Sequence, residues 1–289
     1  MPSRRSASPF RSHAGRNPST SQWRPGYCCT RSCVGADIVI VLGAVLLGLC
    51  VGSFLNVCIL RLPRDQSLVR PRSTCPNCKQ PIAWRDNVPL FSWLWLRGKC
   101  RWCHKPISKQ YPLIEALVGV LFGASILVYG PTLHALAAAL FGTILLGIAI
   151  TDARHYIIPD EFTWGGLVIG LLLALGGGVQ GFLQALLGAA VGFVLLWLVG
   201  MAGTWVFKEE AMGGGDVKMM AMVGSFVGWH GVLLTVFAGA ALGSLIFVPL
   251  SIKKKRLVPF GVFLAVGAVV AFVFGDAIIA WYGHFLKGD

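Results

Sequence analysis

Long apolar runs recur along almost the whole 289-residue chain and constrain its fold more than any other feature. Hydrophobic residues make up 55% of the chain and charged residues only 13%, about half the charged fraction of an average soluble domain. A run of about 20 apolar residues crosses the hydrocarbon core as a helix. The runs lie at residues 36–60, 113–130, 131–151, 162–176, 179–207, 217–229, 232–250 and 257–282. The sequence therefore predicts an all-α polytopic membrane protein.

Charged residues between the runs predict their number and orientation. The run 217–229 has only about a dozen residues and could by itself fail to span. If it did not cross, the basic cluster 253–256 would lie outside, contrary to the positive-inside rule. We therefore predict about eight transmembrane helices with both termini outside. The predicted cytoplasmic loops are 61–112, 152–161, 207–218 and 251–256.

The formal charge of +13 comes from 25 Lys and Arg against 12 Asp and Glu. These basic residues lie in short blocks between apolar runs, as in cytoplasmic loops, so binding of nucleic acid is not expected. Residues 1–36 contain no acid and many Ser, Pro and Gly, and are expected to be a disordered basic tail. A first transmembrane helix at 37–60, a cytoplasmic polar domain at 61–112 and a transmembrane domain at 113–289 are expected to follow.

Four of the nine cysteines form two Cys-x-x-Cys pairs in the basic segment 61–112, namely Cys75 with Cys78 and Cys100 with Cys103. Each turn points two thiolates into one space, and two turns complete the tetrahedral sulfur site that Zn²⁺ prefers. A redox role is the alternative, but the segment lacks a βαβ pattern and a cytoplasmic loop is reducing. The sequence predicts a structural zinc site that orders a segment with little core of its own.

Two aspartates lie at the ends of apolar runs. Asp152 closes one run, where a carboxylate faces the negative end of the helix dipole, so local structure gives no reason for it. Asp216 follows Gly213, Gly214 and Gly215, which allow positive φ and the close approach of another chain. A helix N-cap is the alternative role for Asp216. In the predicted topology both acids emerge on the cytoplasmic face, where one can act as general base on water and the other as general acid.

Other polar residues near these acids have ordinary predicted roles. Asp160, after Pro159, is expected to cap the next helix with its side chain. Lys218 is expected at the lipid headgroups, with orientation of a carboxylate as the alternative. The His155 ring is expected to be solvated or to face the headgroups at the membrane edge, rather than to be catalytic. Glu115 is expected in the first turn of its helix, where the dipole favours a negative charge.

Short motifs follow one another in a fixed order from about Gly48 to near the C-terminus. They are Gly52-Ser53-Phe54-Leu55-Asn56-Val57, Arg61-Leu62-Pro63, Pro71-Arg72-Ser73, Trp84-Arg85-Asp86-Asn87-Val88-Pro89, Ser92-Trp93-Leu94, Arg97-Gly98-Lys99-Cys100, Ile107-Ser108, Tyr111-Pro112, Asp152 with Ile157-Ile158-Pro159-Asp160, Glu210 to Lys218, and Pro259-Phe260-Gly261. With these motifs the chain resembles the type IV prepilin peptidases, the bifunctional leader peptidase and N-methyltransferase family of type IV pilus and type II secretion systems.

The resemblance implies that Asp152 and Asp216 are catalytic and that the four paired cysteines bind zinc. It implies cleavage of the basic leader of prepilins and pseudopilins, typically after a glycine, at the cytoplasmic face of the bacterial inner membrane. Methylation of the new N-terminal residue by S-adenosylmethionine would follow. No glycine-rich fold for S-adenosylmethionine is visible, so the methyltransferase residues are unassigned, and 61–112 is the one polar segment large enough to suspect.

Two other classes of function stay open. A proton- or cation-coupled transporter also contains intramembrane carboxylates, but it predicts acids near the middle of spans, whereas Asp152 and Asp216 lie at span ends. A membrane scaffold organised by its zinc module is the other class. In that case the turn before Asp216 is only a helix cap, and Asp216→Asn leaves the function intact.

Overall fold

The computed structural model describes residues 31–70, 72–209, 212–251 and 259–287. The predicted disorder of residues 1–36 therefore lies mostly outside the described residues. The first helix begins at Arg31, earlier than the predicted residue 37. Residues 38–289 form one unit of the chain, and the description below concerns this unit.

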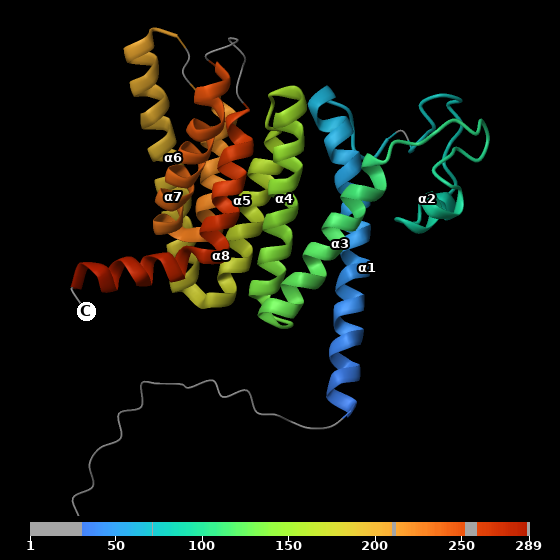
Figure 1. Cartoon of the computed structure of the whole chain (residues 1–289), viewed down its shortest axis with the longest axis horizontal. Coiled ribbons are helices and arrows are strands. Elements are labelled where there is room, and N and C mark those ends of the chain that lie inside the picture. The colour runs from blue at the N-terminus through green and yellow to red at the C-terminus, as the bar shows by residue number, and fades with distance from the viewer. Residues whose placement is uncertain (1–30, 71, 210–211, 252–258, 288–289) are drawn as a thin grey trace, which may run out of the picture. The chain divides into compact units, whose positions relative to one another are not determined.

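The described residues are helical apart from turns and two isolated β-bridges, which confirms the predicted all-α class. Figure 1 shows the elements in chain order. They are α1 (Arg31–Arg61), η1 (Leu62–Arg64), η2 (Trp84–Asn87), α2 (Phe91–Trp95), α3 (Gln110–Tyr129), α4 (Leu133–His155), α5 (Asp160–Ala174), η3 (Leu175–Gly177), α6 (Gly178–Phe207), α7 (Gly214–Ser251) and α8 (Phe260–Lys287).

Six stretches of the described residues are long and apolar enough to cross a membrane. This confirms a polytopic membrane protein but not the predicted count of eight spans. Two of the six stretches contain a break in the helix. The stretch Asp160–Val206 includes η3 between α5 and α6, and the stretch Gly214–Ile246 includes the non-helical residue Gly228.

Helix α7 reverses direction at Gly228, whose φ of 67° belongs to the left-handed region that glycine adopts without steric cost. Close approaches on the two sides of this residue establish the reversal. Before it, Gly188 and Gly192 of α6 lie against Gly224 and Met220 of α7, so these two helices are antiparallel. After Gly228, the remaining part of α7 returns along α8, where Gly267 lies against the Thr235 carbonyl and Gly243 lies against Phe263. Ile158 lies against both Gly215 at the start of α7 and Gly261 at the start of α8, so the two ends of α7 lie at the same end of the bundle.

Backbones in this bundle approach each other closely because glycines leave out the Cβ atom. A Cβ at Gly188 would lie 2.2 Å from the Gly224 carbonyl oxygen, and one at Gly224 would lie 2.1 Å from the Gly188 carbonyl oxygen. Small residues serve this purpose in membrane helices, where association depends on van der Waals packing rather than on the hydrophobic effect. Figure 1 shows α4 to α7 and the first part of α8 side by side, in agreement with the packing of α7 on α5, α6 and α8 and of α4 on α5 and α8.

In the polar segment between α1 and α3, residues 62–109, the described residues form only the short helices η1, η2 and α2. We call it the cysteine module. Its regular backbone pairing consists of the bridges Thr74–Pro81 and Lys99–Pro106, one beside each cysteine pair. The module therefore has little secondary structure of its own.

Candidate active site and candidate metal centre

Asp152 and Asp216 come to the same end of the helix bundle from two different helices. Asp152 lies in the last turn of α4 and is only 6% exposed. Asp216 lies in the first turn of α7. Ile158, in the loop after α4, lies between the starts of α7 and α8. A Cβ at Gly215 would be 3.0 Å from the Ile158 Cβ, and a Cβ at Gly261 would be 2.9 Å from the Ile158 Cδ1.

The two carboxylates are close enough to interact electrostatically. Helix α8 contributes to the same site, because the backbone N–H of Val262 donates a 3.1 Å hydrogen bond to Asp152 Oδ2. Gly261 also lies against this carboxylate, since a Cβ there would be 2.9 Å from Oδ2. Asp216 Oδ1 is buried and has no hydrogen-bond partner among the described residues. The two carboxyl groups therefore belong to one site, where a negative charge on one disfavours a negative charge on the other.

The glycines before Asp216 act differently from the prediction. None of Gly213, Gly214 and Gly215 has positive φ. Gly215 provides close packing against Ile158, whereas a Cβ at Gly213 would make only an ordinary 3.7 Å contact with Asp216 Oδ2. Asp216 is not the N-cap residue, because α7 already begins at Gly214.

Asp160 does not cap α5 with its side chain, contrary to the prediction. Pro159 is the N-cap residue, and no side chain caps this helix end. Both oxygens of Asp160 instead accept hydrogen bonds of 2.8 Å from Lys218 Nζ. Lys218, the fifth residue of α7, therefore joins this helix to the first turn of α5, rather than only facing the headgroups. His155 is exposed, as predicted.

Glu115 also differs from its predicted role. It is the sixth residue of α3, beyond the first turn, and is only 7% exposed. Its Oε2 accepts a 2.8 Å hydrogen bond from the backbone N–H of Leu90, at the start of α2. Glu115 therefore attaches the cysteine module to a membrane helix.

The four predicted cysteines come together. Their sulfur atoms all lie within 4.8 Å of one another. The Sγ atoms of Cys75 and Cys103 are 3.8 Å apart, and those of Cys78 and Cys100 are 3.9 Å apart. A zinc–sulfur bond of about 2.3 Å gives tetrahedral sulfur–sulfur edges of about 3.8 Å. The residues present therefore fit a tetrahedral metal ion.

The Cys75 side chain is prepared to act as a thiolate ligand. Backbone N–H groups of Cys78 and Asn77 donate to its sulfur and lower the pKa of Cys75 to about 6. Metal ligation requires deprotonated thiols.

Asp86 and Arg101 form an ion pair that joins η2 to the second cysteine turn, with Arg101 Nε 2.8 Å from Asp86 Oδ2. The hydrogen-bonded Arg101 guanidinium lowers the pKa of Asp86.

The two cysteine turns are copies of one local structure. The N–H of Cys75 donates to the Gln80 carbonyl, and the N–H of Cys100 donates to the Lys105 carbonyl. Lys79 and His104, which directly follow the turns, both have positive φ. The sequence signal is Cys-x-x-Cys-x-x-Pro-Ile, at 75–82 and again at 100–107, and our prediction used only its cysteines.

Two protein-family models match this chain, one in its N-terminal part and one in its C-terminal part. The model of the bacterial peptidase A24 N-terminal domain matches residues 46–129, and the model of the type IV leader peptidase family matches residues 139–248. A prepilin leader peptidase/N-methyltransferase of Aeromonas hydrophila is 35% identical over 269 residues, which cover 82% of this chain and 91% of that protein. The chain belongs to the type IV leader peptidase family.

Other relatives in the leader peptidase family carry the same name. The protein of Stutzerimonas stutzeri is 38% identical over 281 residues, covering 86% of this chain and 96% of that protein. The protein of Myxococcus xanthus is 42% identical over 214 residues, covering 74% of this chain. This chain spans 64% of the length of the Myxococcus protein. No solved structure matches the chain.

Each of the two family models covers one of the candidate sites, the metal centre or the aspartate pair. The N-terminal domain match contains all four clustered cysteines, and the leader peptidase match contains Asp152 and Asp216. The catalytic role of these two aspartates stays a prediction, as does that of their glycine loop.

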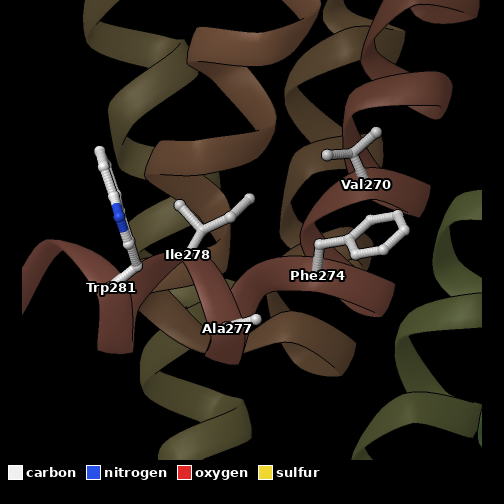
Figure 2. A pocket seen from close by; sticks show the side chains of 5 residues that line it. All are labelled: Val270, Phe274, Ala277, Ile278 and Trp281. Atoms are coloured by element: carbon white, nitrogen blue, oxygen red, sulfur yellow. The ribbon is translucent and has the colours of Figure 1, made fainter.

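A cavity of about 370 Å³ lies elsewhere, on α8. Figure 2 shows that apolar and aromatic side chains line it, namely Val270, Phe274, Ala277, Ile278 and Trp281. Val270 is nine residues beyond Gly261, which places it about 13 Å along the helix from the Asp152 contact. The lining contains no carboxylate, so this cavity is not a candidate for the acid chemistry.

Proposed function

We propose that this chain is a membrane aspartic endopeptidase that removes the leader of prepilins and pseudopilins and then methylates the new N-terminus. The observation that carries the proposal is the meeting of Asp152 and Asp216 at one end of the bundle, each at the end of its helix. The names of the relatives, prepilin leader peptidase/N-methyltransferase, supply the substrate class and the second activity.

In the proposed hydrolysis, one carboxylate accepts a proton from water while the resulting hydroxide attacks the peptide carbonyl carbon. The other carboxyl donates its proton to the carbonyl oxygen. Collapse of the tetrahedral intermediate breaks the C–N bond, and the leaving amine takes up a proton. The Val262 N–H holds Asp152 in place for this chemistry. A site at the helix ends allows water to enter, whereas a transporter would favour acids in the middle of spans.

In the proposed methyl transfer, the new N-terminal amine attacks the methyl carbon of S-adenosylmethionine. The carbon–sulfur bond breaks, S-adenosylhomocysteine leaves and the amine loses a proton. The donor is a consumed substrate, so hydrolysis does not require it.

We further propose that the four cysteines hold a structural Zn²⁺, which supplies folding free energy to the cysteine module. The spacing of the sulfurs supports this assignment.

We also propose eight crossings of the bacterial inner membrane. The breaks at η3 and Gly228 support this count, since each divides one apolar stretch into two antiparallel helices. The basic module then lies on the cytoplasmic side together with the two aspartates.

The test is cleavage of a purified prepilin, followed by mass spectrometry of the product with and without S-adenosylmethionine. Wild-type protein is expected to remove the leader in both cases and to add one methyl group only with the donor. Asp152→Asn is expected to abolish cleavage. Asp276→Asn is the matched control, because this exposed acid of α8 lies outside the site. Full cleavage by Asp152→Asn would contradict the mechanism.

A further inference from the structure

Helix α2 of the cysteine module has an exposed apolar face. Phe91, Leu94 and Trp95 are spaced i, i+3 and i+4, so they share one side of the helix. Trp95 is 84% exposed. Trp93 is on the other side, where its ring packs against Gly98. The exposed face thus has no partner within the described part of the chain.

Two more exposed tryptophans lie on elements joined to α2. Trp84 belongs to η2, which contacts α2, and is 86% exposed. Trp102 lies in the second cysteine turn, is 67% exposed, and is next to Arg101, whose ion pair with Asp86 joins this turn to η2. The aromatic surface, as we call it, consists of Trp84, Phe91, Leu94, Trp95 and Trp102. Large apolar side chains exposed on adjoining elements favour contact with a partner over exposure to water.

The segment around the aromatic surface is strongly basic, which favours an anionic partner. Residues 61–112 contain eleven Lys or Arg and two acids. A second copy of the module, or the basic leader of a prepilin, would bring like charge to this surface. Tryptophan together with Lys and Arg is the composition found where proteins contact the headgroup region of a membrane. Basic residues near an anionic bilayer are attracted to its negative surface potential.

The attachment of α2 places this surface near the membrane. Leu90 directly precedes α2, and its N–H donates to Glu115, the sixth residue of the membrane helix α3. With a rise of about 1.5 Å per residue, Glu115 is about 7.5 Å along the helix from its first residue. The start of α2 is therefore held beside the first turns of a membrane-spanning helix, within reach of the headgroups.

We propose that the aromatic surface binds the headgroup region of an anionic phospholipid bilayer. The aromatic rings enter the interface while the basic residues of the module attract the lipid phosphates. Binding holds the cysteine module against the membrane beside α3. The inference rests on the proposed function only in placing this bilayer face on the cytoplasmic side.

The full-length protein, labelled with 5-fluorotryptophan, tests the proposal in nanodiscs. The fluorine signals are assigned with Trp84→Phe, Trp95→Phe and Trp102→Phe variants. One sample contains a phospholipid with a nitroxide on its headgroup, and another contains a water-soluble gadolinium chelate. In discs that contain phosphatidylglycerol, the signals of Trp84, Trp95 and Trp102 are expected to broaden several-fold more with the nitroxide lipid than with the chelate. Trp93 is the matched control on the opposite side of α2 and is expected to broaden less with the lipid.

Three outcomes would overturn the proposal. Broadening by the chelate alone would show that the surface faces water. Protection from both reagents would show that protein covers it, as in a second copy of this chain. If the nitroxide lipid broadened these signals equally in discs of pure phosphatidylcholine, binding would not require anionic lipid. Prepilin cleavage is measured on the same samples, so failure of this proposal is distinguishable from failure of the proposed peptidase.

Discussion

The cysteine module and the helix bundle are ordered by different interactions. In the bundle, glycines let backbones touch, as where Gly188 and Gly224 face each other across α6 and α7. In the module, four sulfurs and a few hydrogen bonds replace a core, and several aromatic rings face outward. A membrane bundle can obtain its order from tight packing along long helices. A short polar segment needs a metal or another covering surface.

The largest expected effect concerns the metal. Cys75→Ser leaves three thiolate ligands, so the purified protein is expected to fall from about one zinc ion per chain to near zero. Hydrogen exchange of residues 72–109 is expected to rise to the level of an unfolded segment, because structural zinc supplies most of the order in modules of this size. Exchange in α4 to α8 is expected to stay unchanged.

Cys50→Ser is the matched control for this change, since Cys50 is an exposed cysteine of α1 outside the cluster. It should leave both metal content and exchange as they are in the wild type. If Cys75→Ser also unfolded the helix bundle, this would contradict the claim that the metal orders only the cysteine module.

The second effect concerns the contact of α8 with the candidate active site. Gly261→Ala forces a methyl group against Asp152 Oδ2 and Ile158, so one of them must move. Small displacements of a reacting group cost about a hundredfold in rate. We expect kcat for leader cleavage to fall by roughly tenfold to a hundredfold, with little change in KM. Gly275→Ala is the control, because its Cβ would meet nothing within 4 Å, and equal rates in both variants would contradict the assigned position of Gly261.

A third effect tests the packing of the bundle itself. Gly188→Ala places a Cβ against the backbone of α7 and is expected to cost about 1–3 kcal/mol of stability. Gly165→Ala in α5 meets nothing within 4 Å, and it is expected to be neutral or stabilising by up to about 1 kcal/mol, because alanine is the better helix former. Thermal denaturation in detergent should separate the two variants. A similar melting temperature for both would mean that the bundle is loosely packed.

The smallest effect concerns the ion pair inside the module. Because Arg101 holds the pKa of Asp86 below its ordinary value, the ion pair stabilises the folded module at neutral pH. That contribution is lost only as the pH falls through the pKa of the folded state. The Arg101 side chain is 38% exposed, so water screens the pair, and Asp86→Asn should accelerate hydrogen exchange in residues 84–102 only slightly at pH 7. Asp65→Asn, an exposed acid of the same segment, should have no effect there.

Features encoded within a short stretch of sequence could be predicted. Apolar length predicted the membrane helices, and Cys-x-x-Cys spacing predicted the sulfur cluster, because a turn of four residues positions its own thiolates. The first helix nevertheless begins six residues early, because a helix can continue into the residues that flank its apolar span without changing that span.

Roles that depend on distant partners could not be predicted. Asp160 pairs with Lys218, 58 residues away, and Glu115 accepts from Leu90, 25 residues away. Local helix rules suggested a cap and a dipole contact instead, and both were wrong. The contribution of Gly261 and Val262 to the Asp152 site likewise required the packing of α8 against α4. Only the resemblance to a family had indicated the Pro259-Phe260-Gly261 motif.

The most direct test of the account is a single-turnover reaction of a purified prepilin with an excess of Asp216→Asn protein, followed by intact mass spectrometry. We expect the prepilin to keep its full mass, while wild-type protein under the same conditions converts it to leader and mature pilin. Zinc content and melting temperature of the variant should match the wild type. Conversion of the prepilin by Asp216→Asn at the wild-type rate would contradict the assignment of the carboxylate pair.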